Sequence, residues 1–290
     1  MISNKKFGIY CSLPGLLIIV ALILYPVIYN LYISLLRYDF ITPITYNGIA
    51  NYKWALNSKD FYNSWKISTL YSLGSAGFTL LFSLMVAHSL RGIRRAKSIF
   101  RTLSILPWAA PLIVSGFMWR WIFSKETGIL NYLLILFGLT NENIGFLVNP
   151  ALAMFCGIMT TTWSYIPFMT VLLLAGLESI SDELYEAAKI DGADAIQRFW
   201  YISLSLNKQN IVIALLIIWM YTFRTPDVFV SLTGGGPGKA TYHAGQLLWD
   251  YVYRFLNFGR AGAISILLTI TIIIPSYFVL SYFLRKGSNI

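Results

Sequence analysis

Carboxylates are concentrated in one short segment of this chain. Six of the 12 Asp and Glu residues lie between positions 178 and 194. They are Glu178, Asp182, Glu183, Glu186, Asp191 and Asp194. A carboxylate on a helix surface, such as that of Glu186, can form an ion pair with an Arg or Lys of a partner protein. The segment therefore predicts recognition of a partner, with a solvated helical hairpin as the plainer alternative.

Patterns typical of catalytic and metal sites are missing from the sequence. It contains no HExxH, no CxxC and no nucleophile elbow, and His88 and His243 stand alone. Cys11 and Cys156 lie in apolar runs, which favours buried small side chains over a disulfide or a zinc site. Because an enzyme needs two or three catalytic groups together, we expect no enzymatic activity and no cofactor or metal bound by this chain.

A glycine-rich segment at 233–240, TGGGPGKA, resembles a phosphate-binding loop only at first glance. Thr233 stands where the first glycine of that motif belongs. Ala240 stands where a Ser or Thr would ligate magnesium. We therefore expect a flexible or sharply turning loop, and no nucleotide site in this chain.

The composition is that of an integral membrane protein. Hydrophobic residues make up 57% of the chain and charged residues only 12%, against about 25% charged residues in soluble domains. The net charge of +10 is better explained by basic loops on one side of a membrane than by nucleic acid as a partner. The sequence thus predicts an all-α membrane bundle that forms a single domain, residues 1–290.

Six stretches reach the roughly 20 apolar residues that a membrane span needs. They are residues 9–35, 67–90, 103–123, 151–177, 210–232 and 263–284. Residues 129–139 are about half that length and predict a helix in or near the membrane interface. Aromatic residues at 242–256 predict a short external helix.

The basic residues fix the expected orientation. With six spans, 12 of the 22 Lys and Arg residues fall on one side, and five of them lie at positions 91–101. By the positive-inside rule, both termini and the 178–209 loop are then cytoplasmic. The basic loop 91–101 is interpreted as a topology anchor, with binding of anionic membrane lipid as the alternative.

The acidic loop has a sequence that folds by local rules. Ser181 is a candidate N-cap of a helix whose first turn is acidic. Ala187 and Ala188 keep one side of that helix slim, so that it can enter a groove. Gly192 can adopt the left-handed conformation that ends the helix. A second helix at about 194–203 then returns towards the membrane.

The fourth and fifth spans carry polar residues at membrane depth. Trp163 and Tyr165 precede Pro167 in the fourth span. This stretch is interpreted either as a kinked packing helix or as the wall of a pathway. In the fifth span, Arg224 and Asp227 share a face if the helix persists through Pro226. The alternative is that the span ends early and both charges are interfacial.

One motif resembles a known family. The run YEAAKIDGADAIQRFWYISLSL, residues 185–206, is similar to the EAA loop of binding-protein-dependent ABC importer permeases. The likeness extends back through WSYIPFMTVLLLAGLESISDEL and forward through VSLTGGGPGKAT and FGRAGAISILL. This combination resembles the sugar branch, the maltose and glycerol-phosphate type. The sequence departs from the family at Leu204-Ser205, where Leu-Pro is usual, which affects the expected local geometry.

The resemblance implies a type I importer permease in the inner or plasma membrane of a prokaryote. A second permease, two cytoplasmic ATPases that hold ATP and magnesium, and an external solute-binding protein would complete the transporter. Contact with the ATPase would fall on Glu186, Ala187, Ala188, Asp191, Gly192 and Ala193.

A sugar pathway would need aromatic faces and fixed hydrogen-bonding groups in a cavity. Candidates chosen by depth and chemistry are Trp163, Tyr165, Tyr221, Arg224 and Asp227. The external GGGP segment and the abundance of aromatic residues favour a sugar. An importer of a different solute is the first alternative, an ion-coupled carrier or channel the second and a membrane enzyme the third.

Overall fold

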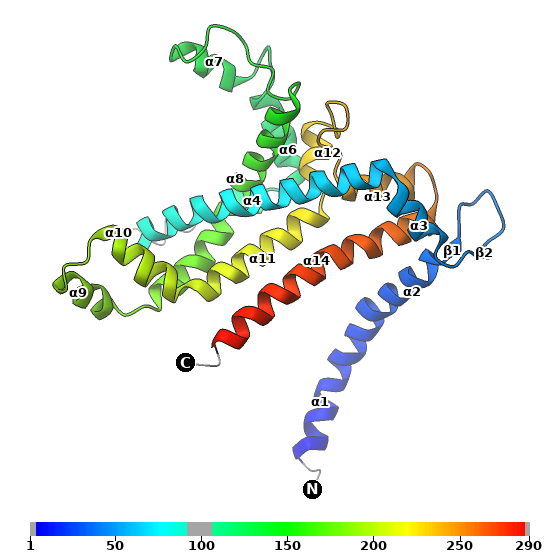
Figure 1. The fold of residues 1–290 in the computed structure, drawn as a ribbon, viewed down its shortest axis with the longest axis horizontal. Coiled ribbons are helices and arrows are strands. Elements are labelled where there is room, and N and C mark those ends of the chain that lie inside the picture. Colours follow the sequence, from blue (N-terminus) through cyan, green and yellow to red (C-terminus); the bar gives the residue numbers. More distant parts are fainter. Residues whose placement is uncertain (1–3, 92–105, 288–290) are drawn as a thin grey trace. The chain divides into compact units, whose positions relative to one another are not determined.

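The computed structural model describes residues 4–91 and 106–287, so most of the basic loop at 91–101 lies outside the described residues. The described chain is mostly helical, as predicted, and its described residues include one two-stranded sheet (Figure 1). Its helices include α1 (Asn4–Ile19), α2 (Tyr25–Ser34), α3 (Ala50–Asn57), α4 (Lys59–Arg91), α6 (Leu112–Ile122), α7 (Ile129–Leu136), α8 (Pro150–Glu178), α9 (Asp182–Ile190), α10 (Ala195–Arg198), α11 (Lys208–Arg224), α12 (Asp227–Leu232), α13 (Ala244–Tyr253) and α14 (Phe258–Gly287). Two π-helical segments, η1 (Val20–Leu24) and η2 (Phe199–Leu204), and the strands β1 (Leu36–Arg37) and β2 (Thr45–Tyr46) complete this set.

Four helical stretches of the described chain are long and apolar enough to cross a membrane. They are Ser12–Ser34, Lys59–Arg91, Pro150–Glu178 and Phe258–Phe283. A fifth candidate is the pair Ala195–Leu204 and Lys208–Arg224, whose axes differ by 72°. The predicted span at 103–123 begins outside the described residues, and its described part holds α6, which is only 11 residues long. The structure thus supports four or five of the six predicted spans.

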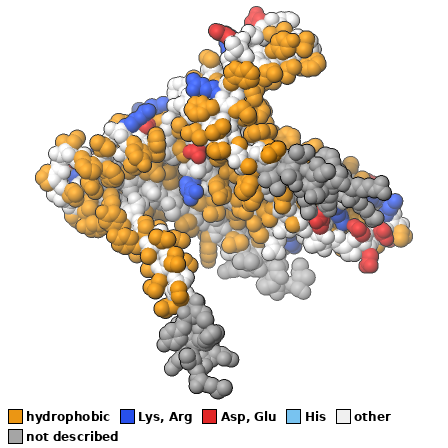
Figure 2. All heavy atoms as spheres, turned by 180° about the vertical axis from the view of Figure 1, so that it is seen from behind, with side chains coloured by type: hydrophobic (Ala, Val, Ile, Leu, Met, Phe, Trp, Pro, Cys, Tyr) orange, Lys and Arg blue, Asp and Glu red, His pale blue; other side chains and the backbone are white. Residues whose placement is uncertain are grey.

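The short elements outside the spans agree with the sequence. The helix expected at 129–139 is α7, and the helix expected at 242–256 is α13. Apolar side chains cover much of the face drawn in Figure 2. This is the surface expected where lipid or partner subunits replace water around the helices.

The chain divides into two compact units. The first comprises residues 1–62 and 247–270. Asn51 is buried in this unit, and its Nδ2 donates to the carbonyls of Ser34 and Leu36 at 2.9 and 2.8 Å. Trp54 lies beneath the Arg260 guanidinium at 4.4 Å and meets the Tyr251 ring edge-on. These contacts join α3, β1 and the start of α14 within this unit.

The second unit, residues 63–246 and 271–290, holds the candidate functional elements. Its largest apolar core lies between α4, α8 and α11 and includes Leu90, Leu173, Leu174, Leu177 and Ile218. Helix α8 supplies most of these side chains and runs unbroken through Pro167. The two ends of the 178–209 loop are therefore attached to helices that share one core.

The fifth predicted span is interrupted at the charged sequence. Helix α11 ends at Arg224, Thr225 is extended with φ −100° and ψ 118°, and α12 begins at Asp227. Pro226 has no N–H to continue the α11 hydrogen-bond ladder, which explains the break. Since the helix does not persist, Arg224 and Asp227 do not share a helical face, and the alternative of an early helix end holds.

Candidate functional site

The segment between α8 and α11 begins as the sequence predicts. The Ser181 Oγ accepts a hydrogen bond from the Glu183 N–H at 3.2 Å, and Asp182 and Glu183 occupy the first turn of α9. No side chain of α9 is buried. Glu186 and Ala187 are exposed, and Ala188 is half-buried. The helix therefore presents a slim, acidic surface outward.

Gly192 ends α9 in the left-handed conformation, with φ +82°. The N–H of Gly192 donates to the Lys189 carbonyl at 3.2 Å, and that of Ala193 donates to the Ala188 carbonyl at 2.9 Å. This pair of bonds is the Schellman motif, which needs a residue with positive φ at the position of Gly192. Asp191, the helix C-cap, and Gly192 are exposed, and Ala193 is half-buried.

The second helix of the loop starts with a capping box. The Asp194 side chain accepts from the Gln197 N–H at 2.7 Å, and the Gln197 side chain accepts from the Asp194 N–H at 2.8 Å. Arg198 donates to the Ala193 carbonyl, which fixes the turn from the other side. The helix predicted at 194–203 is α10 followed by the π-helical segment η2. Ser205 is the C-cap residue of η2, so the position where the family has proline continues a helical backbone here.

Arg91, at the end of α4, holds the start of α9. Its Nη2 donates to Asp182 Oδ1 at 2.9 Å and to the Ile180 carbonyl at 3.1 Å. Its guanidinium carbon lies 3.9 Å from the centre of the Tyr185 ring. The Tyr185 hydroxyl in turn shares a 2.9 Å hydrogen bond with Ser203 in η2. These residues join α4, α9 and η2.

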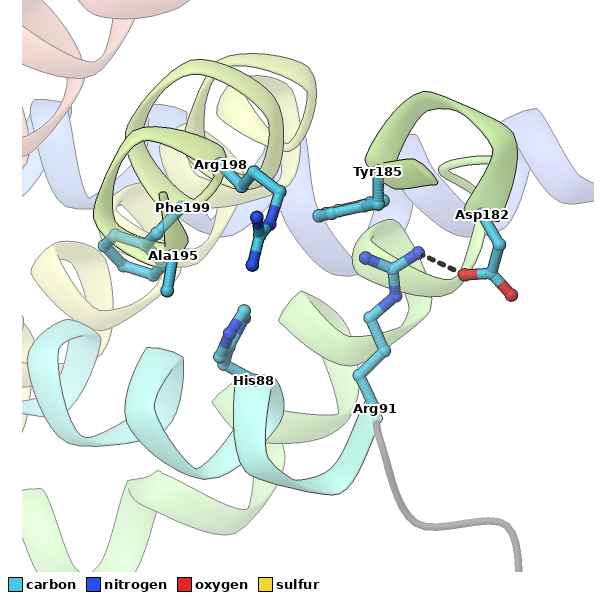
Figure 3. Close-up of a pocket in the computed structure, with 7 residues that line it drawn as sticks. All are labelled: His88, Arg91, Asp182, Tyr185, Ala195, Arg198 and Phe199. Carbon is cyan, nitrogen blue, oxygen red and sulfur yellow. Dashed lines mark hydrogen bonds and ion pairs between the residues drawn. The ribbon is translucent and has the colours of Figure 1, made fainter. Parts of the chain in front are cut away.

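A hollow of about 400 Å³ is lined by Arg91, Asp182 and Tyr185 on one side of the loop and by residues of α10 and η2 on the other (Figure 3). Figure 3 shows the guanidinium of Arg198 and the imidazole of His88 pointing towards one another across it. The His88 ring also meets the ring of Phe199 edge-on, at 5.6 Å between centroids. The end of α4 thus contacts both helical halves of the loop.

The return of the loop into the core is fixed by two asparagines. Asn207 is fully buried, and its Nδ2 donates to the Leu173 carbonyl of α8 at 3.0 Å. Asn210 donates to Asn207 Oδ1 at 2.8 Å. A Cβ at Gly176 would lie only 1.9 Å from Asn207 Oδ1, so glycine is required for this approach. Arg91, Gly176 and Asn207 were not among the site residues predicted from the sequence. For Asn207 a signal was present, because two asparagines directly before an apolar span indicate a buried polar contact.

The predicted pathway residues fall into two groups. The rings of Tyr165 and Tyr221 lie 6.0 Å apart, and the Arg224 guanidinium lies 6.0 Å from the centre of the Tyr221 ring. Asp227 is half-buried at the start of α12. Trp163 instead meets Trp119 of α6 at 5.8 Å. A helix turns about 100° per residue, so Trp163 and Tyr165 point to different sides of α8.

His243 is the buried histidine of the second unit. Its Nδ1 accepts from the Gly245 N–H at 3.0 Å, so its Nε2 carries the proton and donates to the Thr222 carbonyl at 3.0 Å. Burial lowers the pKa of His243 to about 4, and the hydrogen bond to Thr222 opposes this shift. The neutral ring thereby holds the segment before α13 against the end of α11.

Outside the spans, Asp39 has the pKa of a strongly hydrogen-bonded carboxylate. Its Oδ1 accepts from Thr42 N–H at 2.9 Å, Thr42 hydroxyl at 2.9 Å and Ile41 N–H at 3.1 Å. These bonds, Thr42 foremost, with a smaller contribution from Arg37, lower its pKa to about 2. Asp39 closes a local turn. Within the described residues no three His, Cys, Asp or Glu side chains are grouped to hold a metal ion.

Comparison with known proteins agrees with this arrangement. The family model described as "binding-protein-dependent transport system inner membrane component" matches residues 65–287. The trehalose/maltose transport system permease protein MalF of Thermococcus litoralis is 34% identical over 91% of this chain and 89% of its own. The sn-glycerol-3-phosphate transport system permease protein UgpA of Agrobacterium fabrum is 29% identical over 93% of this chain and 92% of its own.

A solved structure has the same fold. The matched chain comes from a bacterial ABC transporter described as importing the acidic polysaccharide alginate. It superposes with a TM-score of 0.80 at 19% identity and covers 97% of this chain and 96% of that one. The predicted type I importer permease fold is thereby confirmed. With the family model matching most of its length, this chain belongs to the inner membrane components of binding-protein-dependent transport systems.

Proposed function

We propose that this chain is one of two membrane-spanning subunits of an ATP-driven importer whose solute is a sugar. The family membership supports an importer permease. The names of similar proteins support a sugar, because they include a trehalose/maltose permease and an alginate importer. In this proposal a second permease forms the other half of the pathway, and an external binding protein delivers the solute. The alginate neighbour has also been described in complex with a solute-bound periplasmic protein.

The coupling part of the proposal rests on α9, which is largely exposed but is held at both ends of its loop. Its outer surface has no buried side chain, yet its first turn and its return are tied to α4 and α8. A helix that only shields the core would bury an apolar face. An exposed helix whose ends are fixed to α4 and α8 is suited to transmit the movement of a partner to these helices. We propose that Glu186, Ala187, Ala188, Asp191, Gly192 and Ala193 meet the cytoplasmic ATPase.

The proposed motion is a rigid-body one. ATP and magnesium act at the partner ATPases, whose closure would displace α9. The Schellman turn at Gly192 and the capping box at Asp194 resist local bending of the loop. The displacement would then pass to α8 through Asn207 and to α4 through Arg91, and it would tilt the spans together. Hinge and shear movements of this kind are common in two-state proteins.

The proposed orientation places both termini and α9 in the cytoplasm, with six spans in all. The 12 Lys and Arg residues that fall on that side of the predicted spans support it through the positive-inside rule. The sugar would contact Tyr165, Tyr221, Arg224 and Asp227 on the side of α8 that faces α11. Aromatic rings offer stacking faces to sugar C–H groups, and Arg and Asp offer hydrogen bonds to hydroxyls. Trp163, also predicted from sequence, points away from this group.

The test is transport by the complete system in proteoliposomes. The chain is purified with its partner permease, its ATPases and its binding protein, and ATP hydrolysis is measured across saccharides, amino acids, phosphate and peptides. Stimulation by one saccharide, with matching uptake, supports the proposal. Stimulation only by a solute of another class overturns the sugar assignment, and transport without any ATPase overturns the importer mechanism.

A further inference from the structure

The hollow between the end of α4 and the 178–209 loop carries more positive than negative charge (Figure 3). Its volume of about 400 Å³ falls within the range of about 300–1,000 Å³ that small-ligand pockets occupy. Five of its seven lining residues have polar side chains, namely His88, Arg91, Asp182, Tyr185 and Arg198. Two guanidinium groups face one carboxylate, so one positive charge is left over while His88 is neutral. Such a lining is suited to an anion.

Arg198 supplies the positive charge that is not balanced. It is half-buried, and within the described residues it forms no ion pair. Its Nη1 donates to the Ala193 carbonyl, which leaves most of the five N–H groups of the guanidinium without an acceptor in the described chain. A partly buried cation without a counter-ion is unfavourable. An anion in the hollow would remove this cost.

Two residues of α4 offer further donors. The Nη2 of Arg91 donates to Asp182 and to the Ile180 carbonyl, whereas its other terminal nitrogen has no acceptor in the described part of the chain and is turned away from Asp182 in Figure 3. His88 faces Arg198 across the hollow, and its ring nitrogens likewise have no hydrogen-bond partner among the described residues. Donors from α4 and α10 therefore converge on one space.

Asp182 does not prevent an anion from binding. Figure 3 shows it beyond Arg91, on the side away from His88 and Arg198. Its side chain is 82% exposed, so water screens its charge. The walls that Tyr185 and Phe199 provide are aromatic, and low-dielectric walls strengthen the attraction between an anion and the guanidinium groups.

The separation of the donors favours a phosphate group over a carboxylate. A carboxylate has two oxygens in one plane, which a single Arg can satisfy with two parallel hydrogen bonds. A phosphate group has three acceptor oxygens that point in different directions, and it can accept from several helices at once. Arg91 also ends a span, so in the proposed orientation the hollow lies at the cytoplasmic membrane surface. Lipid headgroups and soluble phosphate both reach this position.

We propose that this hollow binds a phosphate group, which accepts hydrogen bonds from Arg198, His88 and Arg91. The bound group joins α4 to α10 and adds to the link that Arg91 makes with α9. A lipid headgroup and free phosphate present the same chemistry to these residues. The proposal rests on the lining of the hollow and not on which solute the transporter carries.

The first experiment measures equilibrium binding of radiolabelled inorganic phosphate to the complete transporter in phosphatidylcholine nanodiscs. Phosphate sites of the ATPases are the same in every variant, so the difference between variants reports on this chain. Arg198→Gln is expected to weaken binding about tenfold, the effect of one charge-assisted hydrogen bond. His88→Ala is expected to weaken it about fivefold. His88→Ala breaks no described hydrogen bond, so it keeps the test valid should Arg198→Gln disturb the turn at Ala193.

The second experiment distinguishes the two sources of phosphate. The transporter is placed in nanodiscs that hold equal amounts of phosphatidylcholine and phosphatidylglycerol, and native mass spectrometry counts the lipids that stay bound after release. Phosphatidylglycerol that is retained by the unmodified chain and lost in Arg198→Gln supports the proposal with a lipid as the source. Binding of free phosphate in phosphatidylcholine alone that is weakened in Arg198→Gln supports it with a soluble source.

Lys189→Gln is the matched control, because it removes an exposed positive charge of α9 that does not line the hollow. It is expected to leave both measurements unchanged. Three results would overturn the proposal. The first is equal binding of both phosphate sources by Arg198→Gln and the unmodified chain, and the second is an equal loss in Lys189→Gln, which would indicate a diffuse basic surface. The third is competition by acetate as strong as that by phosphate, which would assign the hollow to a carboxylate, such as one of an ATPase side chain.

Discussion

Arg91 and Asp182 lie 2.9 Å apart, and this contact joins the end of α4 to the first turn of α9. The two residues are 91 positions apart in the sequence. The Asp182 side chain is 82% exposed, whereas that of Arg91 is only 15% exposed. Water therefore weakens the ion pair itself, and the stacking of Arg91 on Tyr185 and its bond to the Ile180 carbonyl fix its direction.

Replacing Arg91 is expected to weaken the transmission of movement more than the stability of the fold. In Arg91→Gln, α9 keeps its caps but loses its link to α4, so more ATP is hydrolysed per solute imported. The measurement is the ratio of ATP hydrolysed to solute transported in proteoliposomes. Arg254→Gln is the control, because it removes an i,i+4 ion pair with Asp250 outside the 178–209 loop, in which the Arg254 side chain is 72% exposed. An unchanged ratio in Arg91→Gln would show that α4 does not move with α9.

Gly192 provides a test of the turn that ends α9. A Val there would need a left-handed backbone, which costs roughly 1–2 kcal/mol for ordinary L-residues and more for a β-branched one. Gly192→Val is therefore expected to prevent stable assembly with the ATPase, measured by co-purification. Gly192→Asn should assemble far better, because Asn tolerates this conformation. Equal assembly of the two variants would contradict the role given to the turn.

Gly176 tests how the loop is anchored to α8. An added Cβ would lie 1.9 Å from Asn207 Oδ1 and 2.0 Å from Asn210 Nδ2, and both side chains would have to move. Gly176→Ala is expected to lower the unfolding temperature and to reduce uptake, with an overpacking cost of about 1–3 kcal/mol. Gly77→Ala, where no atom lies within 4 Å of the new Cβ, should have little effect. If the two variants unfold alike, the Gly176–Asn207 approach is not a constraint.

His243 predicts a pH dependence of stability. Its pKa is lowered to about 4 in the folded chain, against about 6.5 when unfolded. The unfolded state therefore binds the extra proton first, and stability falls as pH drops from about 6.5 to about 4. The slope is at most about 1.4 kcal/mol per pH unit for one proton.

The measurement is thermal unfolding of the detergent-solubilised complex across this pH range. His243→Asn should be less stable at neutral pH, because the contact with Thr222 is lost, and should lose this part of the slope. His88→Asn is the control, since His88 is exposed. If the fall in stability between about pH 6.5 and about pH 4 is unchanged in His243→Asn, groups other than His243 cause it.

The sequence predicted what depends on local patterns. The Ser181 cap and the left-handed Gly192 follow from rules that act over a few residues, and the structure confirms them. At Pro226 the sequence left two alternatives open, and the structure has the early helix end. The contacts of Arg91 with Asp182 and of Asn207 with Leu173 join residues far apart in the sequence, so no local pattern could reveal them. The same holds for Trp163, because the local sequence does not show that α6 packs against its side of α8.

The most direct test of the account is solute uptake by the complete transporter carrying Glu186→Lys. The substitution reverses the charge on the exposed face of α9 without touching its caps. The account predicts normal insertion and normal binding of solute, with uptake reduced to background and ATP hydrolysis no longer stimulated by the loaded binding protein. Glu142→Lys, an exposed charge reversal outside the loop, should transport normally. Normal uptake by Glu186→Lys would contradict the claim that α9 couples this permease to its ATPase.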